Sequence, residues 1–429
     1  MGLNHAAVAA LDRLTRRGAA HAHLDESLHM LTVLAARVPE VSAVMRSVER
    51  YRPTALSRLS GSAASRLHYW LGRRRYEAGG YAEALAHFSR VTGSDARSAE
   101  ARLFEGVSHV RLRRAGPAAA AFERAAESAD PQTRELAWLS LARLRYSVSM
   151  QVPTETPLSR PLGGALAAWR QIPMGSQRFV GAFTEETWAL YLGGNPTLAL
   201  GHAHALRMPE LQVGGASDAE VVRAMIQLEH CQWDALEHTV ERFTRASGPQ
   251  LVGADRSVRM AATRDDAWRV LLAVRAHHSR IPRPVRHQVR SALGGDVLTR
   301  QVQQVRSIDR ERASLAGLGL ESQLLTRVRA DLDAARGRAV ERAAGLTRAA
   351  LVEMRDGLRA RASRMDTIEL ELNTQRRREL VHPNNRPMEP AEGGPITTVQ
   401  AGQRWPWDGE WWPDELPHFR QSIQNRCGR

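Results

Sequence analysis

Residues 71–91 read LGRRRYEAGGYAEALAHFSRV, and they give the clearest indication of the architecture. Two helical segments flank a Gly-Gly dipeptide at 79–80, which is typical of a turn. Gly72 lies in the first segment, and Ala84 and Phe88 lie about one helical turn apart in the second. Because small residues let two helices approach closely, the stretch predicts a helical hairpin.

The same spacing recurs along the chain. Gly106 and Phe122 follow Gly72 and Phe88 after 34 residues. A series of small residues continues the period in steps of 34, 47, 34 and 36 residues: Ala84, Ala118, Ala165, Ala199 and Ala235. One hairpin cannot bury its apolar face alone, so neighbouring hairpins share a core. The period predicts an all-α superhelical array of about five hairpins.

The hairpin stretch resembles the tetratricopeptide repeat (TPR) pattern, through Gly72, Tyr76, Gly79, Tyr81, Ala84, Leu85 and Phe88. The resemblance implies a right-handed superhelix that binds peptides or protein segments on the concave face formed by the first helix of each hairpin. We expect the partner-binding groove to include five first-helix positions: His68, Arg75, Arg102, His109 and Arg113. The alternative is that these side chains form a merely solvated face.

The array is expected at residues 61–250, and residues 1–60 are expected to be capping helices at its N-terminal end. In residues 255–380 the pattern changes to heptad spacing of apolar residues, which predicts long helices that pack on one another or on a partner. The apolar positions from Leu325 to Leu346 are out of phase with those from Leu351 to Leu372. We therefore expect a break or bend between the two sets.

The C-terminal part contains the densest aromatic cluster. Residues 381–402 are polar and proline-rich and predict a linker, and residues 403–429 form a tryptophan-rich tail that contains RWPWDGEWWPDELPHF. We expect the tail to dock on the helical body through its aromatic residues: Trp405, Trp407, Trp411, Trp412 and Phe419. An exposed partner-binding motif is the alternative. Residues 414–427 are expected to form a short helix.

The chain has two cysteines, Cys231 and Cys427, and neither belongs to a CxxC pair. In an oxidising envelope they could form one disulfide that holds the tail on the array, whereas in the cytoplasm both would stay thiols. The pairing requires the two Cα atoms to lie within about 7 Å of each other.

The composition and charge of the chain limit the classes of function that we expect for it. All 60 basic residues other than histidine are arginine, and the net charge is +14. The arginines are scattered among acidic residues, which favours solvated helix faces over a nucleic-acid surface. We expect no transmembrane segment, and the N-terminus shows no apolar signal-peptide region.

Motifs for catalysis are missing. No Walker loop, GxSxG, HExxH or GxGxxG after a strand is present. The histidines of HAHLDESLH, at 21–29, are expected to be helical surface residues and not metal ligands. We therefore expect no enzyme activity, no catalytic residues, no cofactor, no metal and no small-molecule substrate.

Together, the array, the later CQWDALEHTVERF stretch, the long helices and the WPWDGEWWPDEL tail resemble TPR proteins of myxobacteria and their relatives, a group that includes envelope components of the gliding-motility machinery. The resemblance implies a non-enzymatic, periplasmic or envelope-associated scaffold for protein partners. The alternative is a cytoplasmic arginine-rich adaptor that contacts nucleic acid or anionic lipid.

Overall fold

The computed structural model is mostly α-helical, as predicted for an all-α chain. It describes residues 2–16, 22–35, 37–38, 61–93, 96–153, 161–211, 216–276, 281–316, 322–381, 395–400 and 403–427. Two compact units are present: unit 1 comprises Met1–Ser140, Met260–His278 and Ala292–Ala350, and unit 2 comprises Leu141–Arg259, Ser279–Ser291 and Leu351–Arg429. Each unit combines part of the predicted array with part of the long-helix region, so the units do not follow the predicted boundaries.

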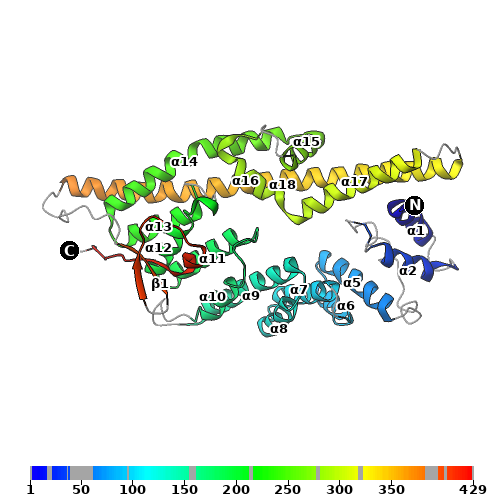
Figure 1. The fold of residues 1–429 in the computed structure, drawn as a ribbon, viewed down its shortest axis with the longest axis horizontal. Helices are drawn as coiled ribbons and strands as arrows, with labels where there is room; N and C mark the ends of the chain where they lie inside the picture. The colour runs from blue at the N-terminus through cyan, green and yellow to red at the C-terminus, as the bar shows by residue number, and fades with distance from the viewer. Residues whose placement is uncertain are drawn as a thin grey trace. The chain divides into compact units, whose positions relative to one another are not determined.

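Unit 1 contains two packed hairpins and the start of a third (Figure 1). Their helices are α5 (Gly61–Glu77), α6 (Tyr81–Phe88), α7 (Ala96–Arg111), α8 (Ala115–Ala126) and α9 (Pro131–Gln151), whose second half belongs to unit 2. Helix α5 packs on α6, α6 packs on α7, and α7 packs on α8.

Both hairpins of unit 1 use the same glycine–phenylalanine contact. A Cβ atom added to Gly72 would lie 2.6 Å from the ring of Phe88, and one added to Gly106 would lie 2.5 Å from the ring of Phe122. Real Cβ atoms do not come so close to a ring, so each first helix needs glycine at this position. The two contacts lie 34 residues apart in the sequence, which explains the spacing on which the hairpin prediction depends.

The repeating alanines follow the predicted pattern with one exception. Ala84, Ala118, Ala165 and Ala199 are completely buried. Ala235 is only half-buried, and the neighbouring Leu236 is completely buried instead. Helix α14 (Trp233–Met260), which carries both residues, has 28 residues and is much longer than α6 or α8. The regular small-residue spacing therefore ends before α14.

Unit 1 is completed by helices from the N-terminus and from the long-helix region: α1 (Asn4–Arg16), α2 (Leu24–Leu34), α15 (Arg264–Arg275), α17 (Asp296–Ala316) and the first part of α18 (Gln323–Val381). Helix α2 packs against α5, and residues 39–60, also predicted to be capping helices, lie outside the described part of the chain. Helix α1 packs on α2 and also on α17 and α18, the latter in a core that includes Ala6, Ile308 and Leu332.

A carboxylate from α17 caps the start of α1. Buried Glu311 accepts backbone hydrogen bonds from His5, at 2.9 Å, and from Ala6, at 3.1 Å. The first amide groups of a helix have no partner within the helix, and a negative charge there is favoured by the helix dipole. Glu311 therefore stabilises the attachment of α1 to α17.

A break or bend was expected in the long-helix region, and the break is wrong. Helix α18 continues for 59 residues through both apolar sets. In unit 1 it buries Leu332 beside Ile308, and in unit 2 it buries Met365 and Ile368 against α13 (Asp218–Glu229) and α14. The helix packs into a different hydrophobic core in each unit. This explains why its two sets of apolar positions are out of phase although the helix is continuous.

Unit 2 contains α10 (Gly163–Trp169), α11 (Phe179–Leu192), α12 (Pro196–Ala205), α13 and α14. Helix α11 packs on α10, α12 and α13. Helix α16 (Arg286–Gly294), preceded by a 3-10 turn at Arg283–Val285, starts in unit 2, where Val285 packs beside Gly253 of α14. Arg361 of α18 pairs with Asp218 at the start of α13.

The C-terminal tail is a small antiparallel sheet, so the predicted short helix is wrong. Its strands, in the order β2-β1-β3, are β1 (Ile396–Gln400), β2 (Gln403–Pro406) and β3 (Phe419–Gln421). Thr398 pairs with both Trp405 and Phe419. Strand β1 lies within the predicted linker. A 3-10 turn at Pro413–His418 precedes β3, and Pro417 lies within the predicted helix, where proline removes a backbone hydrogen bond.

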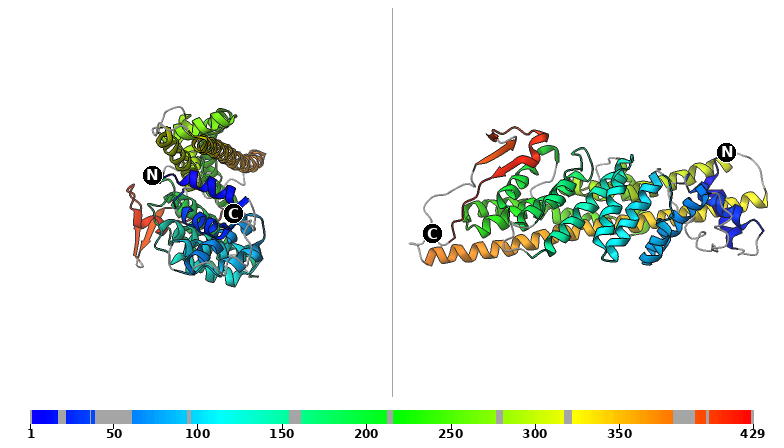
Figure 2. Two further views of the ribbon diagram at one scale, coloured as in Figure 1. Left: turned by 90° about the vertical axis from the view of Figure 1, so that its right-hand side faces the viewer. Right: turned by 90° about the horizontal axis from the view of Figure 1, so that it is seen from below.

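Strand β3 lies on α12 within unit 2, and Figure 2 shows the red strands beside the green helices. Within the described residues, no helix is long and apolar enough to cross a membrane.

We expect Gly106→Ala to destabilise the protein by about 1–3 kcal/mol, because the added methyl group overlaps the ring of Phe122. The matched control is Gly337→Ala, at an exposed position of α18 where no described atom lies within 4 Å of the added Cβ. That change should stabilise the helix by about 0.5–1 kcal/mol. Urea unfolding of the two variants measures both effects, and equal stabilities would contradict the packing account.

Candidate functional site

The predicted groove residues do not form one exposed face. His68 is 7% exposed, and its Nδ1 lies 3.0 Å from Nδ1 of His87, which is on α6. The prediction is therefore wrong for His68, because the second helix of its own hairpin covers this side of α5. Burial and the nearby charges of His87 and Arg90 lower the pKa of His68 to about 4.

The other four predicted groove residues have different environments. Arg75 is exposed at the end of α5 and pairs with Glu83 at 3.1 Å, whereas Arg102 on α7 is half-buried. His109 lies 4.0 Å from Glu105, one turn earlier on α7. Arg113 follows the end of α7 with a φ angle of 58°, so its prediction as a first-helix residue is wrong. Arg75 and Arg102 remain the accessible candidates.

Part of the tail packs on the body of unit 2. Phe419 is completely buried, and Trp407 and Trp411 pack with it in a core that also contains Phe183 and Leu206. In contrast, Trp405 is 57% exposed and Trp412 is 56% exposed, so the expectation that these two dock is wrong.

Strand β3 approaches α12 at a glycine. A Cβ atom added to Gly201 would lie 2.6 Å from the backbone nitrogen of Arg420 and would overlap the carbonyl oxygen of Phe419. Glycine in the middle of a helix is usually unfavourable, by about 0.5–1 kcal/mol relative to alanine. Here it lets the backbone of the tail lie directly on the helix.

Two histidines on α12 lie under the tail. His204 stacks on Trp411 with ring centroids 4.7 Å apart and meets Trp407 edge-on at 4.4 Å, and neither of its ring nitrogens has a hydrogen-bond partner among the described residues. His202 is completely buried, stacks on Phe183, and has its Nε2 3.3 Å from the carbonyl oxygen of Pro417. Burial lowers the pKa of each histidine to about 3, so both are neutral at pH 7.

A buried ion-pair network lies beside these rings. Buried Glu220 of α13 accepts hydrogen bonds from Arg207, at 2.8 Å, and from Arg242, at 2.9 Å. Burial alone raises the pKa of Glu220, but the contact with Arg207 and the nearby arginine charges outweigh it and lower the pKa to about 2. Arg223 donates a 2.7 Å hydrogen bond to Gln421 of β3, so the network also holds the tail.

A disulfide joins Cys231, between α13 and α14, to Cys427 at the end of the tail. The two Cα atoms are 5.1 Å apart. Arg426 donates a backbone hydrogen bond to His230, and Gln232 donates its side-chain amide to Gln424, so the backbone beside the bond is also paired. The link closes a loop of about 200 residues, and native disulfides of this kind contribute about 2–5 kcal/mol.

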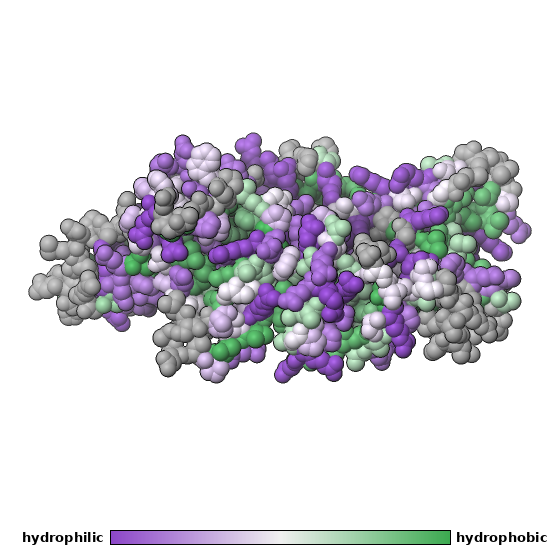
Figure 3. Space-filling model, turned by 60° about the horizontal axis from the view of Figure 1, so that its bottom comes forward, coloured by the Kyte–Doolittle hydropathy of each residue, from purple (hydrophilic) through white to green (hydrophobic). Residues whose placement is uncertain are grey.

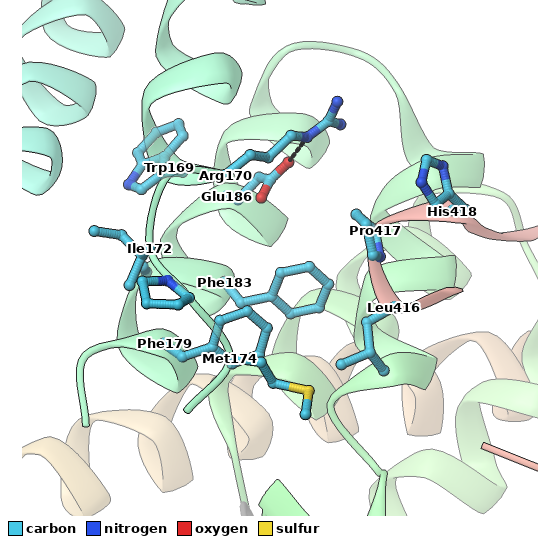
Figure 4. Close-up of a pocket in the computed structure, with 12 residues that line it drawn as sticks. Trp169, Arg170, Ile172, Met174, Phe179, Phe183, Glu186, Leu416, Pro417 and His418 are labelled. Carbon is cyan, nitrogen blue, oxygen red and sulfur yellow. Dashed lines mark hydrogen bonds and ion pairs between the residues drawn. The ribbon is translucent and has the colours of Figure 1, made fainter. Parts of the chain in front are cut away.

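The docked tail forms one wall of a pocket of about 280 Å³ (Figure 4). Most of the lining is apolar: Ile172, Pro173, Met174, Phe179, Ala182, Phe183, Leu416 and Pro417. Trp169, Arg170, Glu186 and His418 complete it. Ligand pockets are commonly concave and apolar with a few polar groups, so this pocket is the candidate functional site.

Glu186 of α11 is the buried charged group of the pocket, with 2% of its side chain exposed. Its Oε1 accepts a 3.1 Å hydrogen bond from Nε of Arg170, whose side chain is 43% exposed. In Figure 4 the other carboxylate oxygen points away from Arg170, toward the side where Phe183 lies. Burial raises the pKa of Glu186 to about 7, although Arg170 opposes the shift.

Comparisons with known proteins do not indicate a function, so the function is inferred from the geometry described above. No protein-family model matches the chain, and no curated protein matches it. The described residues contain no group of three or more His, Cys, Asp or Glu side chains that could hold a metal ion. In the HAHLDESLH stretch, His23 is exposed and pairs with Glu26, whereas His21 lies outside the described residues.

Sequence reasoning missed Gly201, His202, His204 and Glu186. The sequence GHAHAL, at 201–206, offered one signal, because a glycine and two histidines are poor choices for the exposed face of a short helix. Glu186 gave no signal, since Glu185 and Glu186 are adjacent and only the second is buried.

Gly201→Ala is expected to displace β3 from α12, because the new methyl group occupies the position of the Phe419 carbonyl. Hydrogen exchange of residues 396–421 should become faster. Gly181→Ala on α11, where no described atom lies within 4 Å of the added Cβ, is the control and should leave exchange unchanged. Equal protection of the tail in both variants would exclude a tight contact at Gly201.

Acid should weaken the docked tail through His202 and His204. The unfolded chain takes up protons near pH 6.5, whereas the folded protein keeps both rings neutral down to about pH 3. Within this window the unfolded chain binds more protons, so the free energy of unfolding falls as the pH falls, by about 1.4 kcal/mol per pH unit for each ring. His204→Phe retains an aromatic ring and removes one titrating group.

Urea unfolding at pH 6 and pH 5 measures this effect. The loss of stability between the two pH values should be about 1 kcal/mol smaller in His204→Phe than in the wild type. Other buried histidines, including His5 and His68, are common to both proteins and cancel in the comparison. An identical loss in both proteins would mean that His204 is not kept neutral by the tail.

Proposed function

We propose that the protein is a non-enzymatic scaffold of the TPR type that binds protein partners through its helical hairpins. The observation that carries this proposal is the repeated contact of Gly72 with Phe88 and of Gly106 with Phe122, at a spacing of 34 residues. Repeated hairpins with this spacing are typical of TPR arrays, whose stacked helices present an extended binding surface. Arg75 and Arg102 are the side chains that we assign to this surface.

The bacterial cell envelope is the compartment that we propose, and gliding motility is the process that the resemblance implies. The disulfide between Cys231 and Cys427 supports an oxidising compartment, because cytosolic thiols are normally kept reduced. The bond also supports a scaffold role, since it fixes the tail on unit 2 and a rigid surface loses less entropy on binding.

The second candidate is an arginine-rich adaptor for nucleic acid or anionic lipid, and it has weaker support. On the face drawn in Figure 3, hydrophilic residues are spread among smaller apolar areas. Many arginines are also neutralised locally, as in the pairs of Arg207 with Glu220 and of Arg376 with Asp234. Phosphate recognition usually needs a concentrated basic surface.

Affinity capture with the full chain tests the scaffold proposal. The double variant Arg75→Glu and Arg102→Glu should lose protein partners that the wild type retains, because charge reversal places like charges opposite the partner. Arg264→Glu on α15 is the control, because it makes the same kind of charge change at an exposed residue that pairs with its neighbour Asp265.

The same capture, repeated with nuclease and at rising salt, separates the two candidates. Protein binding to the hairpins should survive nuclease and decrease modestly with salt. Binding that disappears with nuclease, or that falls steeply and linearly with the logarithm of salt concentration, would support the adaptor instead.

A further inference from the structure

The pocket of unit 2 contains a buried carboxylate whose hydrogen-bonding capacity is only partly used. A carboxylate accepts hydrogen bonds at both oxygens. Oε1 of Glu186 accepts a hydrogen bond from Nε of Arg170, whereas no hydrogen bond from the described residues reaches Oε2. Only 2% of the Glu186 side chain is exposed, and packing alone would be served better by an apolar residue at such a position.

We propose that this pocket binds a compact apolar amine, with the ammonium group at Oε2 of Glu186 and the carbon chain against Phe179, Phe183 and Leu416. This inference goes beyond the scaffold role and does not depend on it. The ligand binds without reacting, so the proposal adds a binding site and not an enzyme activity.

The chemistry of the pocket selects this class of ligand. An ionised carboxylate can only accept hydrogen bonds, so the ligand must be a donor, and a cation gains charge pairing in addition. Aromatic ring faces also attract cations, and Trp169, Phe179 and Phe183 line the pocket. A carboxylate ligand would instead meet the charge of Glu186. Arg170 leaves the site open, because it contacts only Oε1 and 43% of its side chain is exposed.

The size of the pocket sets the size of the ligand. A volume of about 280 Å³ lies just below the range of pockets that hold drug-sized molecules, about 300–1,000 Å³. It therefore suits a short alkyl or arylalkyl chain. Two sources can supply this chemistry: a free small amine, or the side chain of a lysine in another protein.

Binding should depend on pH through Glu186. Burial raises the pKa of this carboxyl group to about 7, so it is mostly protonated at pH 6 and mostly ionised at pH 8. An ammonium ligand prefers the ionised form, and its affinity should therefore be about tenfold higher at pH 8 than at pH 6. Among the described residues that line the pocket, the other charged and titratable groups are Arg170 and His418, and buried His202 of α12 stays neutral over this range.

Calorimetric titration of the purified full chain with n-pentylamine tests the proposal, and n-pentanol serves as the uncharged ligand of the same shape. We expect saturable binding of the amine at pH 8, about tenfold weaker binding at pH 6, and much weaker binding of the alcohol at both pH values. Equal binding of the two ligands, or no saturable binding of the amine, would overturn the proposal.

Two variants assign the binding to the pocket. Glu186→Gln should reduce amine affinity at least tenfold and remove its pH dependence, whereas His418→Gln should keep that dependence. Glu210→Gln makes the same charge change at an exposed position outside the pocket and should bind like the wild type. If Glu186→Gln does not fold, Met174→Trp, at the pocket edge, should block binding by filling the space. Wild-type affinity in Glu186→Gln or in Met174→Trp would refute the assignment.

A second ligand distinguishes the two sources. Lysine that is blocked at its α-amino and α-carboxyl groups keeps a free side-chain ammonium group and also carries a peptide backbone. Binding as tight as that of n-pentylamine supports a protein side chain as the natural ligand. Binding of the free amine alone supports a small molecule.

Discussion

Close contact at glycines determines how the helices of this protein pack. At Gly72 and Gly106 the missing Cβ atom makes room for a phenylalanine ring, and at Gly201 it makes room for the backbone of a strand. The first two contacts set the distance between the helices of each hairpin in unit 1. The third brings β3 onto α12, and with it the wall of the pocket and the cover over two histidines. Small side chains thus fix both the hairpins and the candidate site.

The parts of the fold that depend on local spacing are readable from the sequence. Gly72 and Phe88 lie 16 residues apart, and the same pair recurs at Gly106 and Phe122, so one hairpin contains all the information for its own packing. The heptad positions of α18 likewise predict a long helix. The continuity of α18 was not readable in the same way, because it depends on contacts that are distant in the sequence. The two halves of α18 pack against different neighbours, Ile308 in unit 1 and Phe243 in unit 2.

The candidate site depends on contacts between residues about 200 positions apart, which local patterns do not encode. Trp411 and Trp412 are adjacent and chemically alike, yet one stacks on His204 and the other is exposed. The difference comes from the direction of the tail on α12, and that direction follows from the sheet and from Gly201. The same limit applies to Glu185 and Glu186, since only the packing of α10 and the tail decides which carboxylate is buried.

The disulfide has a consequence for the synthesis of the chain. Cys427 is made 196 residues after Cys231, which takes roughly 10–40 s at ribosomal rates of about 5–20 residues per second. During this interval α12 has left the ribosome, but the strand that covers Gly201, His202 and His204 does not yet exist. Unit 2 therefore completes its core only after translation of the tail. Until then the apolar side of α12 is exposed, and such surfaces are the ones that molecular chaperones protect from aggregation.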